Sequence, residues 1–106
     1  MTVLNALRPG LREKAYERAL VLELRNRGRS IQQQRSFEVI YDGTVVDRLT
    51  PDLIVDDAVI VDPKCVTAFT DAHFAQMLGY LANTGLRLAL LLNFSQSRLQ
   101  WKRIIR

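Results

Sequence analysis

The chain has 106 residues, of which 48% are hydrophobic and 25% charged. This length and apolar content predict one globular domain, residues 1–106, and exclude a largely disordered or low-complexity chain. Fifteen Lys and Arg residues against eleven Asp and Glu give a net charge of +4. That charge suits a polyanionic partner, and it also suits ordinary solubility.

The single cysteine, Cys65, excludes an internal disulfide, and no set of Cys and His residues has the spacing of a zinc site. The longest aliphatic run, residues 88–92, is too short to span a membrane, and residues 1–10 lack the apolar centre of a signal peptide. We therefore expect a cytoplasmic protein without a membrane segment.

Apolar residues recur at three- and four-residue spacing between residues 11 and 27, which predicts an amphipathic helix. An alternating pattern predicts a strand over residues 31–41, and the following Asp42-Gly43 is a strong two-residue hairpin signal. The β-rich runs 53–55 and 58–61 flank Asp56-Asp57 and predict a second hairpin, in which the two acids are turn residues.

A second helix is predicted from a cap at Thr70-Asp71 to Gly85. Residues 86–94 are nearly all aliphatic, as in a strand covered on both faces, and residues 99–105 predict a last amphipathic strand. Because the second helix connects two strands of one sheet, those strands should be parallel. The predicted order is α-β-β-β-α-β-β, an α/β fold.

Asp52 and Asp62 stand beside strongly apolar strand segments, where an unpaired carboxylate would be costly to bury. One explanation is an ion pair of Asp62 with Lys64, which shares its strand face. The other is a divalent cation bound by both aspartates.

A shared cation requires both aspartates on one face of the sheet. That condition pairs Ile54 with Ile60 across a three-residue connection, Asp56-Asp57-Ala58, whereas a two-residue turn would send Asp62 to the other face. The connection contains no glycine, which disfavours the two-residue turn.

Short motifs spread over residues 10–105 together resemble one family, the PD-(D/E)XK nuclease superfamily. Its signature is matched by Pro51-Asp52 followed by Asp62-Pro63-Lys64. Four further segments resemble other parts of the family. Gly10-Leu-Arg-Glu13-Lys-Ala-Tyr16 resembles the motif of the small GxxExxY branch, and Gln76-Met-Leu-Gly-Tyr80 resembles the RecB-like QxxxY element. Leu92-Asn93-Phe94 and Lys102-Arg103-Ile104 resemble the closing strands.

The resemblance implies a mixed sheet flanked by helices and a site that holds Mg²⁺ or Mn²⁺. Its metal ligands would be Asp52, Asp62 and Glu13, with Lys64 beside them as a fourth catalytic residue. Lys64 would either orient the attacking water or stabilise the phosphate. Glu13 has a simpler explanation as well, since an acid in the first turn of a helix complements the helix dipole.

By the same resemblance, the substrate-binding residues would be Gln76, Tyr80, Tyr16 and Arg103. Gln76 and Tyr80 stand four residues apart, on one helix face, although Tyr80 also fits an aromatic side chain at the edge of the core. His73 is better explained as an exposed helix residue than as a metal ligand, because no second histidine accompanies it.

Two residues depart from the family pattern. Asp62 stands where the family usually has Glu, and Pro63 lies inside a predicted strand, where a local bend is expected. Arginines on both sides of these elements suggest a rim that contacts phosphates. Phe94 and Trp101 fit base stacking, but their strand pattern favours core packing.

The sequence thus predicts a metal-dependent nuclease that hydrolyses phosphodiester bonds, with DNA favoured over RNA as the substrate. The alternative is a catalytically degenerate module of the same fold that binds nucleic acid or another protein, including a second copy of the chain in a homodimer.

Overall fold

The computed structural model describes residues 2–106. Within these residues, three helices and seven strands follow one another: α1 (Thr2–Leu7), α2 (Glu13–Asn26), β1 (Ile31–Gln33), β2 (Phe37–Tyr41), β3 (Thr44–Leu49), β4 (Leu53–Val55), β5 (Val59–Lys64), α3 (Asp71–Thr84), β6 (Leu88–Asn93) and β7 (Gln100–Ile105). None of the helices in this range is both long and apolar enough to cross a bilayer.

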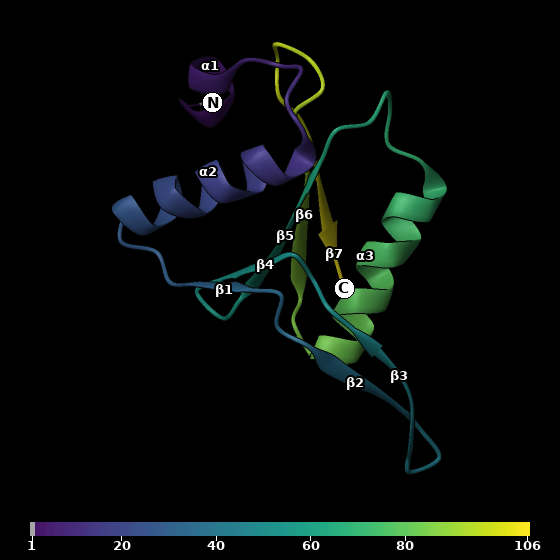
Figure 1. Ribbon diagram of the computed structural model, residues 1–106. Coiled ribbons are helices and arrows are strands. Elements are labelled where there is room, and N and C mark those ends of the chain that lie inside the picture. The colour runs from purple at the N-terminus through teal and green to yellow at the C-terminus, as the bar shows by residue number, and fades with distance from the viewer. Residues whose placement is uncertain (1) are drawn as a thin grey trace.

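Five strands form one mixed sheet in the order β1-β4-β5-β6-β7, with α2 and α3 on its opposite faces (Figure 1). β5 and β6 are parallel, as predicted for strands joined by a helix, and the other neighbouring pairs are antiparallel. The predicted mixed sheet flanked by helices is therefore confirmed. One core cluster, under α3, includes Ile60, Met77 and Leu91, and a second, under α2, includes Leu20 and Val61.

Local signals explain where α3 begins and ends. The Thr70 side chain accepts a hydrogen bond from the His73 backbone N–H, and His73 Nδ1 accepts one from the Thr70 backbone N–H. These reciprocal bonds satisfy two backbone donors at the start of the helix. Gly85 ends the helix with a φ of 78°, a left-handed conformation that glycine adopts without steric cost. The predicted helix boundaries are confirmed, and His73 is a capping residue.

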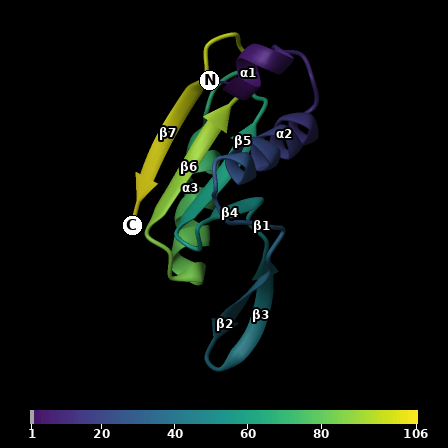
Figure 2. The same cartoon turned by 90° about the vertical axis from the view of Figure 1, so that its left-hand side faces the viewer.

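The first predicted hairpin forms, but outside the main sheet. Asp42 and Gly43 both have positive φ, as the turn requires, and they join β2 to β3 in a separate two-stranded sheet. Figure 2 shows this hairpin projecting from one end of the molecule. The single strand predicted over residues 31–41 is in fact two, because Gln34 takes a left-handed φ of 54° and turns the chain out of the sheet after β1.

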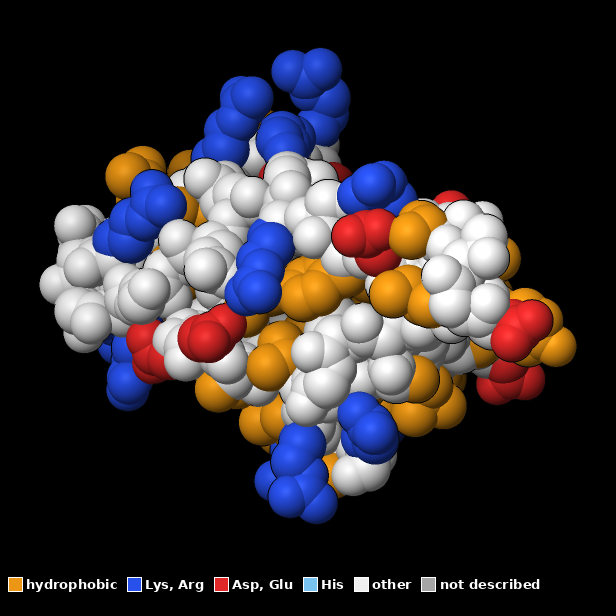
Figure 3. Space-filling view, turned by 90° about the horizontal axis from the view of Figure 1, so that it is seen from below, with side chains coloured by type: hydrophobic (Ala, Val, Ile, Leu, Met, Phe, Trp, Pro, Cys, Tyr) orange, Lys and Arg blue, Asp and Glu red, His pale blue; other side chains and the backbone are white. Residues whose placement is uncertain are grey.

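The end of the molecule that carries the hairpin exposes many apolar side chains. Ile40 and Tyr41 are 62% and 74% exposed. In Figure 3, which views the molecule from this end, hydrophobic side chains reach the surface in the middle of the face, and Lys and Arg lie mostly towards its edges.

The second hairpin has the register that a shared cation requires. Ile54 pairs with Ile60 across the three-residue connection 56–58, so Asp52 and Asp62 lie opposite each other just beyond the paired residues of β4. Asp56 and Asp57 are turn residues as predicted, both with a φ of 53°. They also form exposed ion pairs with Arg29 and Arg35.

The bend expected at Pro63 is absent, because β5 pairs with β6 without interruption from Val59 to Lys64. The Lys64 carbonyl accepts from Phe94 N–H, which shows that Lys64 turns its backbone groups towards β6. Adjacent residues of a strand turn their backbone groups to opposite sides, so Pro63, next to Lys64, turns its groups towards β4. The pairing of β4 with β5 does not extend as far as Pro63. Its missing N–H therefore removes no sheet hydrogen bond.

Candidate metal centre

Three carboxylates converge between the start of α2 and the facing ends of β4 and β5. One oxygen each from Glu13, Asp52 and Asp62 lies within 4.8 Å of the other two. The helix contributes Glu13 from its first turn, and the register of the second hairpin contributes the two aspartates. These are the three residues predicted as metal ligands, and the fold brings them together.

Asp62 is the most constrained of the three. Its side chain is 3% exposed, and its Oδ1 is buried without a hydrogen-bond partner among the described residues. The pKa of Asp62 is raised from 3.8 to about 7, chiefly by burial and secondly by Asp52, while Lys64 opposes the rise. The positive charge of Lys64 is therefore not enough to offset the cost of burying an ionised Asp62.

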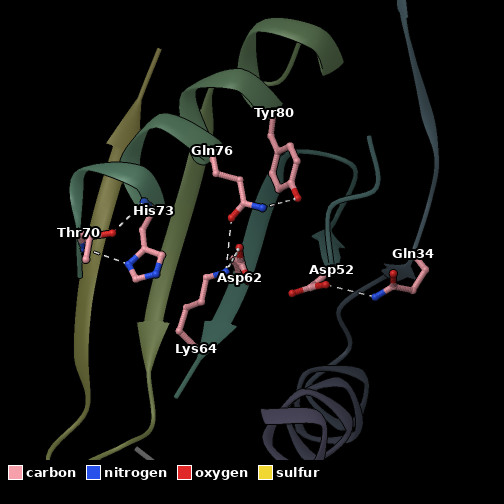
Figure 4. Close-up of polar contacts among 8 residues, drawn as sticks. All are labelled: Gln34, Asp52, Asp62, Lys64, Thr70, His73, Gln76 and Tyr80. Carbon is pink, nitrogen blue, oxygen red and sulfur yellow. Dashed lines mark hydrogen bonds and ion pairs between the residues drawn. The ribbon is translucent and has the colours of Figure 1, made fainter. Parts of the chain in front are cut away.

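Lys64 links Asp62 to α3. Its Nζ lies 3.3 Å from Asp62 Oδ2 and donates to Gln76 Oε1 at 3.4 Å, and Gln76 Nε2 donates to the Tyr80 hydroxyl at 3.0 Å. Figure 4 shows these side chains meeting between α3 and β5. Burial raises the pKa of Tyr80, and the carboxylates of Asp62 and Asp52 raise it further, so the phenol keeps its proton and can donate it to an anionic ligand.

Asp52 is held from the other side by Gln34, which the sequence did not indicate. Gln34 Nε2 donates to Asp52 Oδ1 and to Glu17 Oε1, both at 3.3 Å, and Gln34 N–H donates to the Asp52 carbonyl. Glu17 is 3% exposed and also pairs with Lys14 at 2.6 Å. Glu17 lies in α2, one turn after Glu13, so the same helix contributes to the candidate centre and to its support.

The structure does not bring the other two predicted substrate-binding residues to the centre. Tyr16 is fully buried, stacks on Phe94 at 4.8 Å between ring centroids, and donates its hydroxyl proton to the Arg8 carbonyl. It anchors the segment that leads into α2. Arg103 lies opposite Leu90 on β7, two strands from β5 and on the sheet face that α2 covers, whereas Lys64 contacts α3 on the other face.

Of the two aromatic residues for which core packing was favoured, Phe94 is in the core and Trp101 is not. Phe94 is fully buried, whereas Trp101 is 58% exposed because β7 is the outermost strand of the sheet.

A divalent oxygen-preferring cation fits the donor set. Three carboxylates supply hard oxygen ligands, and the unpartnered Asp62 oxygen is the group that such an ion would satisfy. The Pro63 carbonyl faces the β4 side of β5, where Asp52 lies, so it is a further candidate oxygen ligand. Cys65 does not suit a nucleophile, because burial, and secondarily Glu13, raise the pKa of its thiol.

The family model of the PD-(D/E)XK nuclease superfamily matches residues 1–104, so the chain belongs to this superfamily. The superfamily is one of nucleic-acid-cleaving folds that use divalent metals, in agreement with the acidic cluster. No curated protein sequence matches the chain.

Two solved structures share the fold. The crystal structure of SSO0001 is similar with a TM-score of 0.67 and 15% identity, over 85% of this chain and 48% of that one. An alkaline exonuclease (LHK-Exo) from Laribacter hongkongensis is similar with a TM-score of 0.62 and 16% identity, over 84% of this chain and 53% of that one. The chain thus spans about half the length of these two structures.

Proposed function

We propose that the protein is a nuclease that hydrolyses phosphodiester bonds with Mg²⁺ or Mn²⁺ bound by Glu13, Asp52 and Asp62. The observation that carries the proposal is the convergence of these three carboxylates around a buried and unpartnered Asp62 oxygen in a chain of this superfamily. When bound, the metal would lower the pKa of an attacking water and neutralise charge on the phosphate.

The surrounding side chains have separate roles in this proposal. Lys64, held between Asp62 and Gln76, would place its ammonium group against the phosphate or the attacking water. Tyr80 keeps its phenolic proton and would donate it to a phosphate oxygen. Gln76 positions both neighbours, because it accepts from Lys64 and donates to Tyr80.

The contacts of Gln76 and Tyr80 support assignment to the QxxxY group. The first-turn position of Glu13, with Tyr16 anchoring the segment before it, supports the GxxExxY branch. We propose DNA as the favoured substrate, and we keep the single domain over residues 1–106, the cytoplasmic location and the homodimer as proposals from the sequence.

Cleavage assays with Mg²⁺ and with Mn²⁺, on single- and double-stranded DNA and RNA, test the proposal. We expect cleavage of at least one substrate, and its loss in Asp62→Asn and in Lys64→Ala. Asp47→Asn is the matched control, because Asp47 is an exposed acid on the projecting hairpin.

Lys64→Ala should keep most of its affinity for nucleic acid, since many other cations remain to contact the backbone. If the parent protein cleaves no substrate with either metal but still binds nucleic acid, the nuclease proposal fails in favour of a binding module.

A further inference from the structure

The positive charge of the chain is unevenly distributed. Residues 72–106 contain no acidic residue and five basic ones, so the entire excess of positive charge lies in α3, β6, β7 and their connections: Arg87, Arg98, Lys102, Arg103 and Arg106. None of these five forms an ion pair with an acid of residues 2–106. By contrast, six of the ten basic residues before Asp71 are paired with an acid. The sheet edge at β7 therefore carries a group of cations with no acidic residue among its neighbours in sequence.

A groove of about 760 Å³ lies on this side, between β7 and the N-terminal part of α3. Phe74 lines it from α3, and Phe69 lines it from the segment before α3. The centroids of the two rings are 6.3 Å apart, and the rings are inclined by 62°. Lys102 lines it from β7, and Arg98 lines it from the loop that precedes this strand. Among the described residues, no Asp or Glu contributes to its lining.

The groove is distinct from the metal centre but close to it. Lys64 pairs with Asn93, and Asn93 pairs with Gln100, which lines the groove, so the groove begins two strands from Lys64, on the order of 10 Å across the sheet. Phe74 and Gln76 are two residues apart on α3 and so point to opposite sides of the helix. Gln76 faces the metal centre, and Phe74 faces the groove.

We propose that this groove binds unpaired nucleotides of the nucleic-acid strand that is cleaved at the metal centre. The proposal rests on the nuclease function and adds a substrate class to it, namely single-stranded nucleic acid or a frayed duplex end. Aromatic rings bind bases by stacking, and a base offers its face to such a ring only when it is unpaired. The phosphates beside it would contact Arg98 and Lys102.

A second copy of the chain is a poorer occupant of this edge. If two β7 strands paired antiparallel about a twofold axis centred on the strand, Lys102 would oppose Arg103 of the other copy. Like charges directly opposite each other destabilise a strand pair. The charge of the edge therefore favours a polyanion.

Trp101 allows the groove to be observed directly. It is the only tryptophan of the chain, and it is 58% exposed. Because Trp101 and Lys102 are adjacent in β7, their side chains leave the strand on opposite faces of the sheet. Trp101 nevertheless lines the groove, because β7 is the free edge of the sheet. Its fluorescence should therefore change when the groove fills.

The experiment is a titration of the full chain in EDTA with a short oligothymidylate, followed by Trp101 fluorescence. Because no metal is present, binding is measured separately from cleavage. We expect saturable quenching that weakens with salt. A blunt duplex should bind without comparable quenching, and a single-stranded RNA of the same length shows whether the sugar matters.

Three variants test the groove, and all of them retain the tryptophan. Arg98→Ala and Lys102→Ala should each weaken binding and reduce the slope of log affinity against log salt by about 0.7, as expected for one lost contact to a single strand. Phe74→Leu keeps an apolar side chain against the core but removes the aromatic face, and it should weaken binding about 5-fold or more. Arg48→Ala removes the same charge from the projecting hairpin and should leave affinity unchanged within about twofold.

Failure of this inference is distinguishable from failure of the nuclease function. If cleavage occurs with Mg²⁺ or Mn²⁺ but the oligonucleotide neither quenches Trp101 nor binds more weakly to the three variants, the groove proposal is wrong and the nuclease stands. If quenching and the variant effects are found without any cleavage, the groove stands as a binding site for unpaired nucleotides only, and the nuclease function fails. If Trp101 fluorescence instead changes with protein concentration alone, or a blunt duplex quenches equally well, the groove does not bind unpaired nucleotides.

Discussion

Asp62 connects the stability of the protein to pH. Its pKa in the folded protein is raised to about 7, whereas the unfolded value is near 3.8. The folded state therefore holds a proton that the unfolded chain releases, so the contribution of Asp62 to the free energy of unfolding is most favourable below pH 4 and becomes less favourable as the pH rises to about 7. Above that pH the whole penalty of a buried, ionised Asp62 is present.

We expect the metal-free protein to lose stability between about pH 4 and pH 7, by up to about 4 kcal/mol. Urea unfolding in EDTA at a series of pH values measures this change. The free energy of unfolding of Asp62→Asn should depend less on pH over the same range, because the asparagine side chain does not titrate. Equal pH dependence in both proteins would show that Asp62 is not the group responsible.

We expect Gln34 to position the carboxylates of the candidate metal centre, because its amide donates to both Asp52 and Glu17. Gln34→Asn retains an amide and tolerates the left-handed φ of 54°, but it is one methylene shorter and cannot reach both carboxylates. We expect it to weaken Mn²⁺ binding about tenfold or more, with a smaller effect on unfolding in EDTA. Calorimetric titration measures the affinity.

The matched control for this change is Gln33→Asn, since Gln33 is the exposed neighbour in β1. Equal metal affinities in the two variants would exclude a positioning role for Gln34.

The sequence indicated the three carboxylates that the fold brings together, but not the residues that hold them in place. Asp52, Asp62 and Lys64 are recognisable because they interrupt apolar strands at a fixed spacing. Gln34 carries no such signal, since it acts only after β1 pairs with β4 and places it beside Asp52. Trp101 was misjudged for the same kind of reason. Strand alternation tells which face a residue occupies, but not whether the strand lies at an uncovered edge.

At the scale of the element, α3 and the residue that caps its C-terminus provide two glycines for which alanine should have opposite effects. Gly79 lies inside the helix, and a Cβ added there meets no atom within 4 Å, so Gly79→Ala should stabilise the protein by about 0.5 to 1 kcal/mol. Gly85 has a φ of 78° with equally open surroundings, so Gly85→Ala should destabilise it by about 1 kcal/mol through the backbone alone. Urea unfolding compares the two, and a shift of the same sign in both would contradict this assignment.

Elements with strong local signals were predictable, and those decided by distant contacts were not. The caps of α3, the Asp42-Gly43 turn and the three-residue connection between β4 and β5 are all determined within a few residues. In contrast, α1 has only six residues, too few for a helix to be stable alone, and it forms where Val3 and Leu4 pack against the Tyr16 and Phe94 cluster. The separation of the β2–β3 hairpin from the main sheet also depends on tertiary packing.

At the scale of the whole molecule, the acidic and basic groups serve two different surfaces. The carboxylates of the candidate metal centre come from α2, β5 and the residue before β4, while five cations without an acidic partner lie in and around β6 and β7. α3 separates the two, with Gln76 facing the first surface and Phe74 the second. A polyanion bound as we propose would therefore meet cations beside the site, and a bound metal would neutralise the acids within it.

This arrangement predicts that a divalent metal stabilises the whole fold. Because the three ligands come from α2, from β5 and from beside β4, they are brought together only in the folded state, so the cation binds the folded chain and not the unfolded one. At a metal concentration about 100 times its dissociation constant, the free energy of unfolding should rise by about 2.7 kcal/mol.

Scanning calorimetry with millimolar Mg²⁺ or Mn²⁺, at constant ionic strength, should show a higher Tm in the parent protein and in Asp47→Asn. The increase should be absent in Asp62→Asn, and it should be larger near pH 8 than near pH 6, because protons compete with the metal for Asp62. An unchanged Tm in the parent protein at both pH values would mean that the carboxylates do not form a metal site.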